Sequence, residues 1–317
     1  MAGRVLVVGS FNLDHVWSVD ALPARGATRL ASYASGPGGK GFNQAVAAAR
    51  AGATTSFVTA LGEDAAAAVA RKLADEDGIS LLAESFADQP SGTAGIFVDA
   101  SGRNIIAVAP GANALLSATH VQSLAPTLAE AAVVLAQLEV APDAVHAALS
   151  LARGHGAVTV LNPAPANAPT TPALLALADV LTPNETEFAG LLGRHGNRSA
   201  DPATLHACTD EALHALCQSL QAATWVITLG AHGAFVSHAA EQLRGDSSQA
   251  YRIPAHPARV VDTTGAGDAF NGALAAALAR TPGGAFADAV KRATRYAAAS
   301  TEVAGAALSM PRLDPRG

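Results

Sequence analysis

The chain has 317 residues, which is long enough for one large α/β domain with a generous core, although two smaller domains would also fit this length. Its formal net charge of −6 and its aromatic content of 4% argue against a nucleic-acid-binding protein, which usually presents a basic face. The two cysteines, Cys208 and Cys217, are too few for a disulfide scaffold and do not have a zinc-ligand spacing.

These features also bear on where the protein works. The scarcity of cysteine favours a reducing compartment, and we expect both cysteines to be inert helix residues. The apolar run at residues 5–8 is too short for a signal peptide, and no stretch approaches the roughly 18 apolar residues of a membrane span. The sequence therefore predicts a cytoplasmic protein without membrane or nucleic-acid partners.

Short β-branched segments alternate with Ala-rich segments of helical character. This alternation predicts βαβ units around a largely parallel, buried sheet. The predicted strands are residues 5–8, 56–60, 133–137, 157–161, 180–182 and 225–229. The predicted helices are residues 43–50, 65–75, 142–153, 211–221, 269–280 and 285–299.

Two segments break this alternation, residues 15–35 and 93–108. The second contains the turn Asp99-Ala100-Ser101-Gly102, which is typical of a β-hairpin. We therefore expect both segments to form a small β lid. Residues 193–210 are rich in Gly, Asn, Arg and His without clear periodicity, which predicts a surface loop.

A glycine-rich run at residues 36–41 reads Gly-Pro-Gly-Gly-Lys-Gly and matches the dinucleotide-binding pattern Gly-x-Gly-x-x-Gly. That pattern should join the first strand directly to a helix, whereas 27 residues separate Val8 from Gly36. It is not a P-loop either, because Gly39-Lys40 is followed by Gly41 and not by Ser or Thr. Two interpretations remain: a mobile loop before a helix, or a close backbone approach to a hydroxylated ligand that Lys40 and Asn43 also bind.

A second small-residue run, at residues 261–272, reads Val-Asp-Thr-Thr-Gly-Ala-Gly-Asp-Ala-Phe-Asn-Gly. Gly265, Ala266 and Gly267 are small enough to turn consecutive N–H groups inward, in front of a helix whose N-terminal dipole end is positive. This predicts an anion hole. Asp268 would sit beside the bound phosphate, where a carboxylate suits a general base in phosphoryl transfer. The alternative is an ordinary turn in which Asp268 only caps the helix.

The 261–272 run resembles the C-terminal signature of the ribokinase-like (PfkB) family of carbohydrate kinases. Residues 38–45 read Gly-Gly-Lys-Gly-Phe-Asn-Gln-Ala and resemble the family's second signature, with Phe42 where a small residue is usual. Four more segments resemble the family in the same order along the chain, at residues 9–14, 162–165, 182–187 and 228–230.

The resemblance implies a ribokinase-like three-layer α/β fold, with a mostly parallel central sheet flanked by helices and a small β-sheet lid over the sugar. Residues 1–317 would form one kinase domain, with lid segments at about 13–36 and 92–109. In this family the lid also mediates dimerisation, so the resemblance implies a homodimer.

The resemblance also implies a polar sugar pocket. Its contact residues would be Asn12, Asp14, Gly39, Lys40, Asn43, Glu139 and Asp268. Such a pocket needs Asn, Asp and Glu at rigid element ends, because sugar hydroxyls both donate and accept hydrogen bonds. Asn12 and Asp14 are expected at the end of the first strand. Taken alone, they could belong to an ordinary turn, and Glu139 could be a solvated loop carboxylate.

For the nucleotide, the resemblance implies contacts from Asn184, Thr228, Leu229, Gly230, Gly267 and Asn271. Glu187 would act on Mg²⁺ through water, which suits an ion that keeps several waters and favours a carboxylate near phosphates. Asn184 and Glu187 could instead be plain residues of a helix N-terminus, where both types are favoured.

A monovalent cation site for K⁺ is implied beside the anion hole. Its first loop would contribute Asp262 and Thr264, and its second loop Val303, Gly305 and Ser309. The second loop departs from the commoner family form Arg-Lys-Gly-Ala-x-Pro-Ser, although backbone carbonyls could still bind an ion.

The function implied is ATP-dependent phosphorylation of D-ribose at O5, giving D-ribose 5-phosphate and ADP. Asp268 would be the base, and residues 265–268 would hold the transferring phosphoryl group. A kinase for deoxyribose, another small sugar or a nucleoside is the alternative within the class. A sugar-binding regulator without turnover and a nicotinamide oxidoreductase are alternatives from other classes; the intact Asp268 argues against the regulator.

Overall fold

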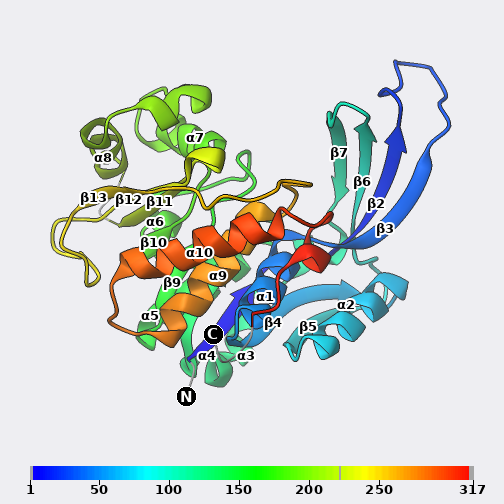
Figure 1. The fold of residues 1–317 in the computed structure, drawn as a ribbon. Coiled ribbons are helices and arrows are strands. Elements are labelled where there is room, and N and C mark those ends of the chain that lie inside the picture. The colour runs from blue at the N-terminus through cyan, green and yellow to red at the C-terminus, as the bar shows by residue number, and fades with distance from the viewer. Residues whose placement is uncertain (1–2, 221–222, 314–317) are drawn as a thin grey trace.

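A computed structural model describes residues 3–220 and 223–313 of the chain. Its large sheet lies between two layers of helices, and a smaller sheet projects from one end (Figure 1). The large sheet has the strand order β13-β12-β11-β10-β9-β8-β1-β4-β5, and the small sheet has the order β3-β2-β6-β7. This arrangement confirms the predicted fold class.

The strands of the large sheet pair in parallel from β5 across to β11, whereas β12 and β13 extend the sheet in antiparallel fashion. Their bounds are β1 (Arg4–Val8), β4 (Thr54–Gly62), β5 (Ser80–Phe86), β8 (Ala131–Ala136), β9 (Val158–Leu161), β10 (Val180–Leu181), β11 (Thr224–Thr228), β12 (Ala234–Ser237) and β13 (Ala250–Ile253).

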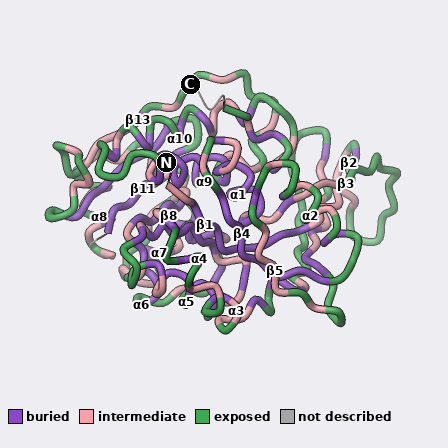
Figure 2. Tube along the Cα trace, turned by 90° about the horizontal axis from the view of Figure 1, so that it is seen from below, coloured by how far each residue is buried: buried purple, intermediate pink, exposed green. Residues whose placement is uncertain are grey.

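Alternate residues of β1 enter two separate cores. Val5 and Val7 pack with α1, α2, α9 and α10 on one face, whereas Leu6 and Val8 pack with α3, α4, α5, α7 and α8 on the other. Buried residues therefore follow the middle of the molecule (Figure 2). The α-helices are α1 (Lys40–Arg50), α2 (Ala65–Glu76), α3 (Ala118–Ser123), α4 (Ala125–Ala129), α5 (Pro142–Gly154), α6 (Pro172–Leu175), α7 (Glu185–His195), α8 (Asp210–Gln218), α9 (Ala266–Arg280) and α10 (Phe286–Ser300).

The lid is the small sheet. It consists of β2 (Asn12–Val19), β3 (Ser32–Gly38), β6 (Gly92–Asp99) and β7 (Asn104–Ala109). The predicted hairpin joins β6 to β7, and its turn is closed by the Asp99 carboxylate, which accepts hydrogen bonds from the N–H groups of Ser101 and Arg103. The predicted lid is therefore present. A short connection at residues 9–11 joins β1 to β2.

Several expectations of local structure differ from the observed fold. Asn12 and Asp14 lie at the start of lid strand β2, not at the end of the first strand. The glycine run is not a mobile loop, because its first three residues end β3 and only Gly39, with φ at 87°, separates β3 from α1. A left-handed φ of this kind suits glycine, so the chain can turn here within one residue.

Helix α9 starts at Ala266, three residues earlier than predicted, so Asp268 lies within its first turn. The predicted loop at residues 193–210 contains the end of α7 and a 3₁₀ helix, η2 (Pro202–Ala207). Cys208 follows η2 and is not a helix residue, whereas Cys217 lies buried in α8 as expected. The predicted helix at residues 211–221 ends at residue 218, and residue 221 lies outside the described part of the chain.

Three further 3₁₀ helices connect these elements, namely η1 (Gly111–Leu115), η3 (Gly230–His232) and η4 (Ala307–Ser309). Among the helices of the described ranges, none has both the length and the apolar character needed to cross a lipid bilayer.

Candidate active site

The N-terminus of α9 forms one wall of a pocket at the edge of the large sheet. Gly265 caps the helix in the left-handed conformation, with φ at 75°, and a Cβ here would lie 3.1 Å from Ala306. The Ala266 N–H donates to the Thr263 carbonyl at 3.1 Å. Since the N–H groups of a first helical turn lack acceptors within their own helix, those of Gly267 and Asp268 are suited to an anion.

Asp268 is 7% exposed and is held by two side chains of α1. Asn43 Nδ2 donates to its Oδ2 at 2.9 Å, and Gln44 Nε2 donates to its Oδ1 at 2.8 Å. Burial raises the pKa of Asp268, while Lys40 and the two amides act in the opposite direction. Asn43 was predicted as a sugar contact. Gln44 was not predicted as a site residue, although it lies in the same family-like segment at residues 38–45.

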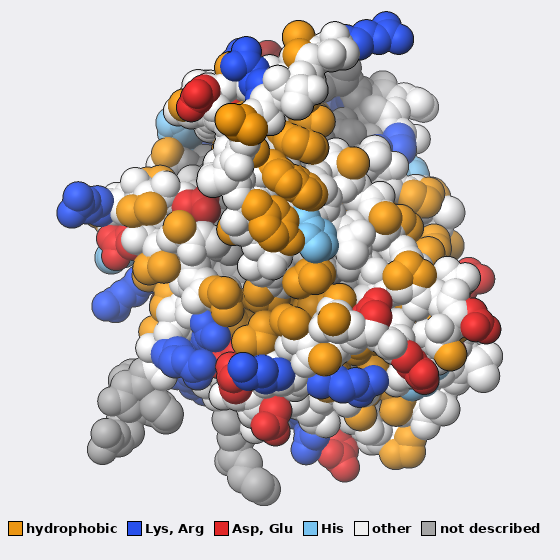
Figure 3. All heavy atoms as spheres, turned by 90° about the vertical axis from the view of Figure 1, so that its right-hand side faces the viewer, with side chains coloured by type: hydrophobic (Ala, Val, Ile, Leu, Met, Phe, Trp, Pro, Cys, Tyr) orange, Lys and Arg blue, Asp and Glu red, His pale blue; other side chains and the backbone are white. Residues whose placement is uncertain are grey.

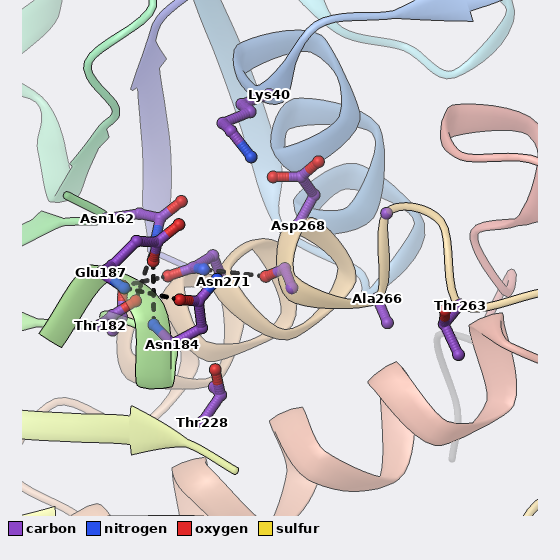
Figure 4. Close-up of a pocket in the computed structure, with 12 residues that line it drawn as sticks. Lys40, Asn162, Thr182, Asn184, Glu187, Thr228, Thr263, Ala266, Asp268 and Asn271 are labelled. Carbon is purple, nitrogen blue, oxygen red and sulfur yellow. Dashed lines mark hydrogen bonds between the residues drawn. The ribbon is translucent and has the colours of Figure 1, made fainter. Parts of the chain in front are cut away.

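Lys40 is the first residue of α1 and points toward Asp268 from the opposite side of the pocket (Figure 4). Burial favours the neutral amine, but the carboxylates of Asp268, Glu139 and Glu187 outweigh it and raise the pKa of Lys40. Its ammonium group therefore stays charged next to the N-terminal turn of α9.

Glu139 is anchored at one oxygen. Its Oε2 accepts hydrogen bonds from Ser10 Oγ at 2.6 Å and from the Lys40 N–H at 3.0 Å. This places a carboxylate from the loop after β8 beside the start of α1, as a sugar-contact role requires. Ser10 was missed as a site residue because a serine between a strand and a lid has no distinctive pattern.

Asn12 and Asp14 stand one residue apart on the same face of β2. Asn113, in η1, donates through Nδ2 to Asn12 Oδ1 at 2.9 Å and so sets the orientation of that amide. Burial, together with Glu139 and Asp268, raises the pKa of Asp14 to about 7. Asn113 is a further residue that sequence reasoning missed, since it comes from 101 positions away.

Two buried side-chain oxygens in this region, Asn43 Oδ1 and Gln137 Oε1, lack a hydrogen-bond partner, and that of Asn43 belongs to a residue next to the base. The side-chain Oδ1 of Asn43 is buried without a hydrogen bond, although its Nδ2 is bound to Asp268. A buried acceptor without a partner is costly, so an O–H donor of a bound ligand would satisfy it.

The pocket at the N-terminus of α9 is lined mostly by polar residues. Figure 4 shows their side chains converging from α1, α7, α9 and the carboxyl ends of neighbouring strands. Predicted site residues in its lining are Lys40, Asn184, Glu187, Thr228, Gly265, Ala266, Gly267, Asp268 and Asn271. Asn162, Thr182 and Thr263 also line it and were not predicted as site residues.

Leu229 and Gly230 are not part of this lining; Leu229 is buried behind it and Gly230 opens η3. The ends of parallel strands are nonetheless where open α/β sheets bind ligands.

Asn184 and Glu187 form a capping box at the start of α7. Asn184 Oδ1 accepts the Glu187 N–H at 2.8 Å, and Glu187 Oε2 accepts the Asn184 N–H at 2.9 Å. The helix-capping interpretation is therefore correct, and it leaves a pocket role open because both residues also line the pocket. Burial raises the pKa of Glu187.

The two loops of the expected cation site meet. Asp262 Oδ1 accepts from the Thr264 N–H at 2.9 Å and from Thr264 Oγ1 at 2.7 Å, and its Oδ2 accepts from the Gly305 N–H at 2.9 Å. These contacts lower the pKa of Asp262 against the effect of its partial burial. The Val303 side chain is 55% exposed, and Ser309 is buried with its hydroxyl donating to the Ala306 carbonyl.

Taken together, the site places a buried carboxylate between a set of fixed polar side chains and a helix N-terminus suited to an anion. Such an arrangement can deprotonate a hydroxyl and stabilise a phosphoryl group on the same side of the base.

Comparison with known proteins bears on the same residues. Residues 2–313 match the family described as pfkB family carbohydrate kinase. The ribokinase of Mus musculus is 36% identical over 312 residues, which cover 98% of this chain and 92% of that protein. The bifunctional ribokinase/ribose-5-phosphate isomerase A of Fructilactobacillus sanfranciscensis is 38% identical over 278 residues, covering 87% of this chain and 48% of that protein, so the chain spans about half the length of this relative.

Among solved structures, the ribokinase of Arabidopsis thaliana in complex with ribose and ATP is similar with a TM-score of 0.81. It is 28% identical, and the similarity covers 100% of this chain and 97% of that one. The fold, including the lid, therefore agrees with that of a structure solved with both a sugar and a nucleotide.

Proposed function

Because this chain belongs to the pfkB family of carbohydrate kinases, we propose that it transfers the γ-phosphoryl group of ATP to O5 of D-ribose, giving D-ribose 5-phosphate and ADP. The names of the relatives support ribose as the sugar, and the Arabidopsis complex supports ribose and ATP as the pair of ligands. The observation that carries the proposal is the position of Asp268, bound to Asn43 and Gln44 at the N-terminus of α9.

The reaction then follows from this chain's own residues. Asp268 accepts the proton of the O5 hydroxyl as the O5–P bond forms and the bond between the γ-phosphorus and the ADP oxygen breaks. The N–H groups of the first turn of α9 stabilise the charge on the phosphoryl oxygens, and the Lys40 ammonium adds positive charge next to them. Ribose is held by Asn12, Asp14, Gly39, Lys40, Asn43 and Glu139.

The nucleotide occupies the pocket beyond Asp268, next to Asn184, Thr228, Gly267 and Asn271, with its adenine near Leu229 and Gly230. The described residues contain no cluster of three or more acidic, His or Cys side chains that could bind a metal alone. This fits Mg²⁺, which keeps its waters and binds mainly through phosphates. Glu187 would hold it through water, and the ion would neutralise charge on the phosphates.

K⁺ would be held by Asp262 and Thr264 together with loop oxygens around Val303, Gly305 and Ser309. The carboxylate of Asp262 fits such an ion because it accepts hydrogen bonds from both loops and because these contacts lower its pKa, which keeps it ionised. The ion would add positive field beside the anion-binding turn.

Three further parts of the expectation belong to the same proposal. The chain would act as one kinase domain over residues 1–317, as a homodimer joined through the lid, and in the cytoplasm. The exposed apolar side of the lid, which includes Tyr33 and Ile105, supports the homodimer.

The test is a coupled assay of ADP release with a sugar panel at saturating MgATP. We expect kcat/KM for ribose to exceed that for hexoses and nucleosides, because unpaired buried polar groups penalise the wrong ligand. Asp268→Asn should lower kcat by about 10²–10⁴-fold while ATP binding is kept. A nucleoside preferred over ribose would overturn the sugar assignment, and near-normal turnover by Asp268→Asn would remove the assigned base.

A further inference from the structure

Gln44 lies at the centre of a buried hydrogen-bond chain behind the base. Its side chain is 0% exposed. Its Nε2 donates both to Asp268 Oδ1 at 2.8 Å and to Asn162 Oδ1 at 3.1 Å, and its Oε1 accepts from Gln137 Nε2 at 2.5 Å. All three contacts join residues at least 93 positions apart in the sequence. The side chain therefore has no remaining hydrogen on its nitrogen for a ligand.

The direction of this chain follows from the charge of Asp268. An ionised carboxylate only accepts hydrogen bonds, so Gln44 must present its NH₂ group to Asp268, and its oxygen must then face Gln137. Asn162 accepts the second hydrogen of the same NH₂ group, so its own Nδ2 donates away from it, to the Thr182 carbonyl at 2.9 Å.

The chain of hydrogen bonds ends at the N-terminal turn of α9. Thr182 Oγ1 donates to Asn271 Oδ1 at 2.5 Å, and Asn271 Nδ2 donates to the Gly267 carbonyl at 2.8 Å. The dashed lines of Figure 4 mark part of this path. Buried polar chains of this kind keep their members in one arrangement when every donor has an acceptor.

We propose that Gln44 is a positioning residue: it fixes the orientation of the Asp268 carboxylate and, through Asn162, Thr182 and Asn271, ties that carboxylate to the Gly267 peptide that faces the phosphoryl group. Asp268 is then bound at two points by consecutive residues of α1, with Asn43 at one oxygen and Gln44 at the other. The inference rests on the proposed function, in which Asp268 is the base.

Four charged or titratable groups face Asp268 from the surrounding elements. They are Lys40 from α1, Glu139 from the loop after β8, Asp14 from β2 and Glu187 from α7. Three of these are acidic and favour the protonated form of Asp268, so donors that favour the ionised form have a strong effect on it. Gln44 supplies one such donor, and its loss removes a hydrogen bond to a charged group.

The experiment replaces Gln44 by Met, which keeps the length and approximate volume of the side chain but removes its donors. We expect kcat for ribose to fall about tenfold or more, as for other lost hydrogen bonds to a charge, and KM for ribose to change much less. The acid limb of the kcat profile should move to higher pH, because the ionised form of Asp268 loses a donor. A purely structural role would lower kcat equally at every pH.

A second readout needs no turnover. The thermal stability of Gln44→Met relative to the wild type should decrease as pH rises from 5 to 8, since the cost of the lost donor grows as Asp268 ionises. The control is Thr59→Val, in neighbouring strand β4, whose buried hydroxyl has no hydrogen-bond partner. Its effect on stability should not depend on pH.

If Gln44→Met does not fold, Gln44→Glu keeps the shape of the side chain and can donate to Asp268 only while it is protonated. Its kcat should then fall relative to the wild type as pH rises, because a second carboxylate would face the first. An unmoved acid limb and a pH-independent loss of stability would overturn the role of Gln44. A wild-type protein that phosphorylates no sugar would instead overturn the proposed function, and the stability readout would still decide the role of Gln44.

Discussion

The orientation of single side chains in this site is fixed by hydrogen-bond partners that are distant in the sequence. Asn43 and Gln44 both belong to the family-like segment at residues 38–45, yet only the structure shows that each donates to one oxygen of Asp268. Ser10 binds Glu139 and Asn113 binds Asn12 in the same manner. None of these pairs has a spacing that a sequence pattern could reveal, because the register between elements decides which side chains meet.

Asp14 provides a prediction about pH at this scale. Its pKa is raised to about 7, mainly by burial, from a usual value of 3.8. Between these two values the unfolded chain loses the proton of Asp14 while the folded chain keeps it, so the free energy of unfolding falls as pH rises. Asp14→Asn removes this titration. The melting temperature of the variant, measured without sugar, should therefore rise relative to the wild type from pH 5 to pH 8.

Asp20→Asn, at an exposed position just after β2, is the matched control and should show no such trend. A difference between Asp14→Asn and the wild type that is the same at both pH values would show that Asp14 ionises normally in the folded protein.

At the level of elements, the six predicted strands all correspond to strands of the large sheet, and the six predicted helices all correspond to observed helices. The missed strands β5, β12 and β13 lie toward the two edges of that sheet; β5 and β13 are less continuously apolar, and β12 has only four residues. The predicted start of α9 is three residues late because the glycines at 265 and 267 are poor helix formers, although Gly267 lies within the first turn of the helix. The start of α9 depends instead on tertiary packing, in which Gly265 lies against Ala306 of the neighbouring loop.

Arg50 binds the loop that lies next to the N-terminal turn of α9. Arg50, at the end of α1, pairs with Asp77 at 2.9 Å and donates to the carbonyls of Ala307, Leu308 and Met310. Gly305, in the same loop, binds Asp262. The two expected cation loops are therefore anchored to each other and to α1.

This arrangement bears on the cation. If K⁺ binds between these loops, it should raise kcat when it replaces Na⁺ or a tetraalkylammonium ion at constant ionic strength, because it stabilises the turn at Gly265 and adds positive field at the phosphate. Asp262→Ala should weaken that response. Arg259→Ala removes a charge from the same exposed segment and keeps the backbone N–H that donates to Glu302, so it is the control and should respond as the wild type does. Equal rates in all three cations would show that no such site operates.

On the scale of the whole molecule, the lid presents an apolar outer side. Asn12, Asp14 and Val16 share one face of β2, so Trp17 lies on the opposite face, away from the proposed sugar contacts. Trp17 is paired with Tyr33 and with Phe97, whose own cross-strand partner is Ile105. The rings of Trp17 and Phe97 are stacked, with their centroids 5.2 Å apart. Figure 3 shows hydrophobic side chains gathered on this end of the molecule.

Ile105 and Tyr33 are each 55% exposed, and a contiguous apolar row of this kind marks an association surface. We expect Ile105→Lys to shift the protein from dimer to monomer in sedimentation analysis, since a charge would be buried against the partner's lid. Leu313→Lys, at a position outside the lid that is 50% exposed, should leave the oligomeric state unchanged. A wild-type protein that sediments as a monomer at micromolar concentration would contradict the homodimer.

The sequence by itself determined the class of fold, the lid and the two small-residue runs, because hydrophobic period, turn residues and helix-start residues act over short distances. It also determined that a carboxylate, Asp268, follows the small-residue turn at residues 265–267. Only the tertiary structure decided that Gln44 holds that carboxylate, that Asn113 orients Asn12, and that Asp262 joins two loops 43 residues apart. These contacts depend on how strands and helices are registered across the sheet, which no local pattern encodes.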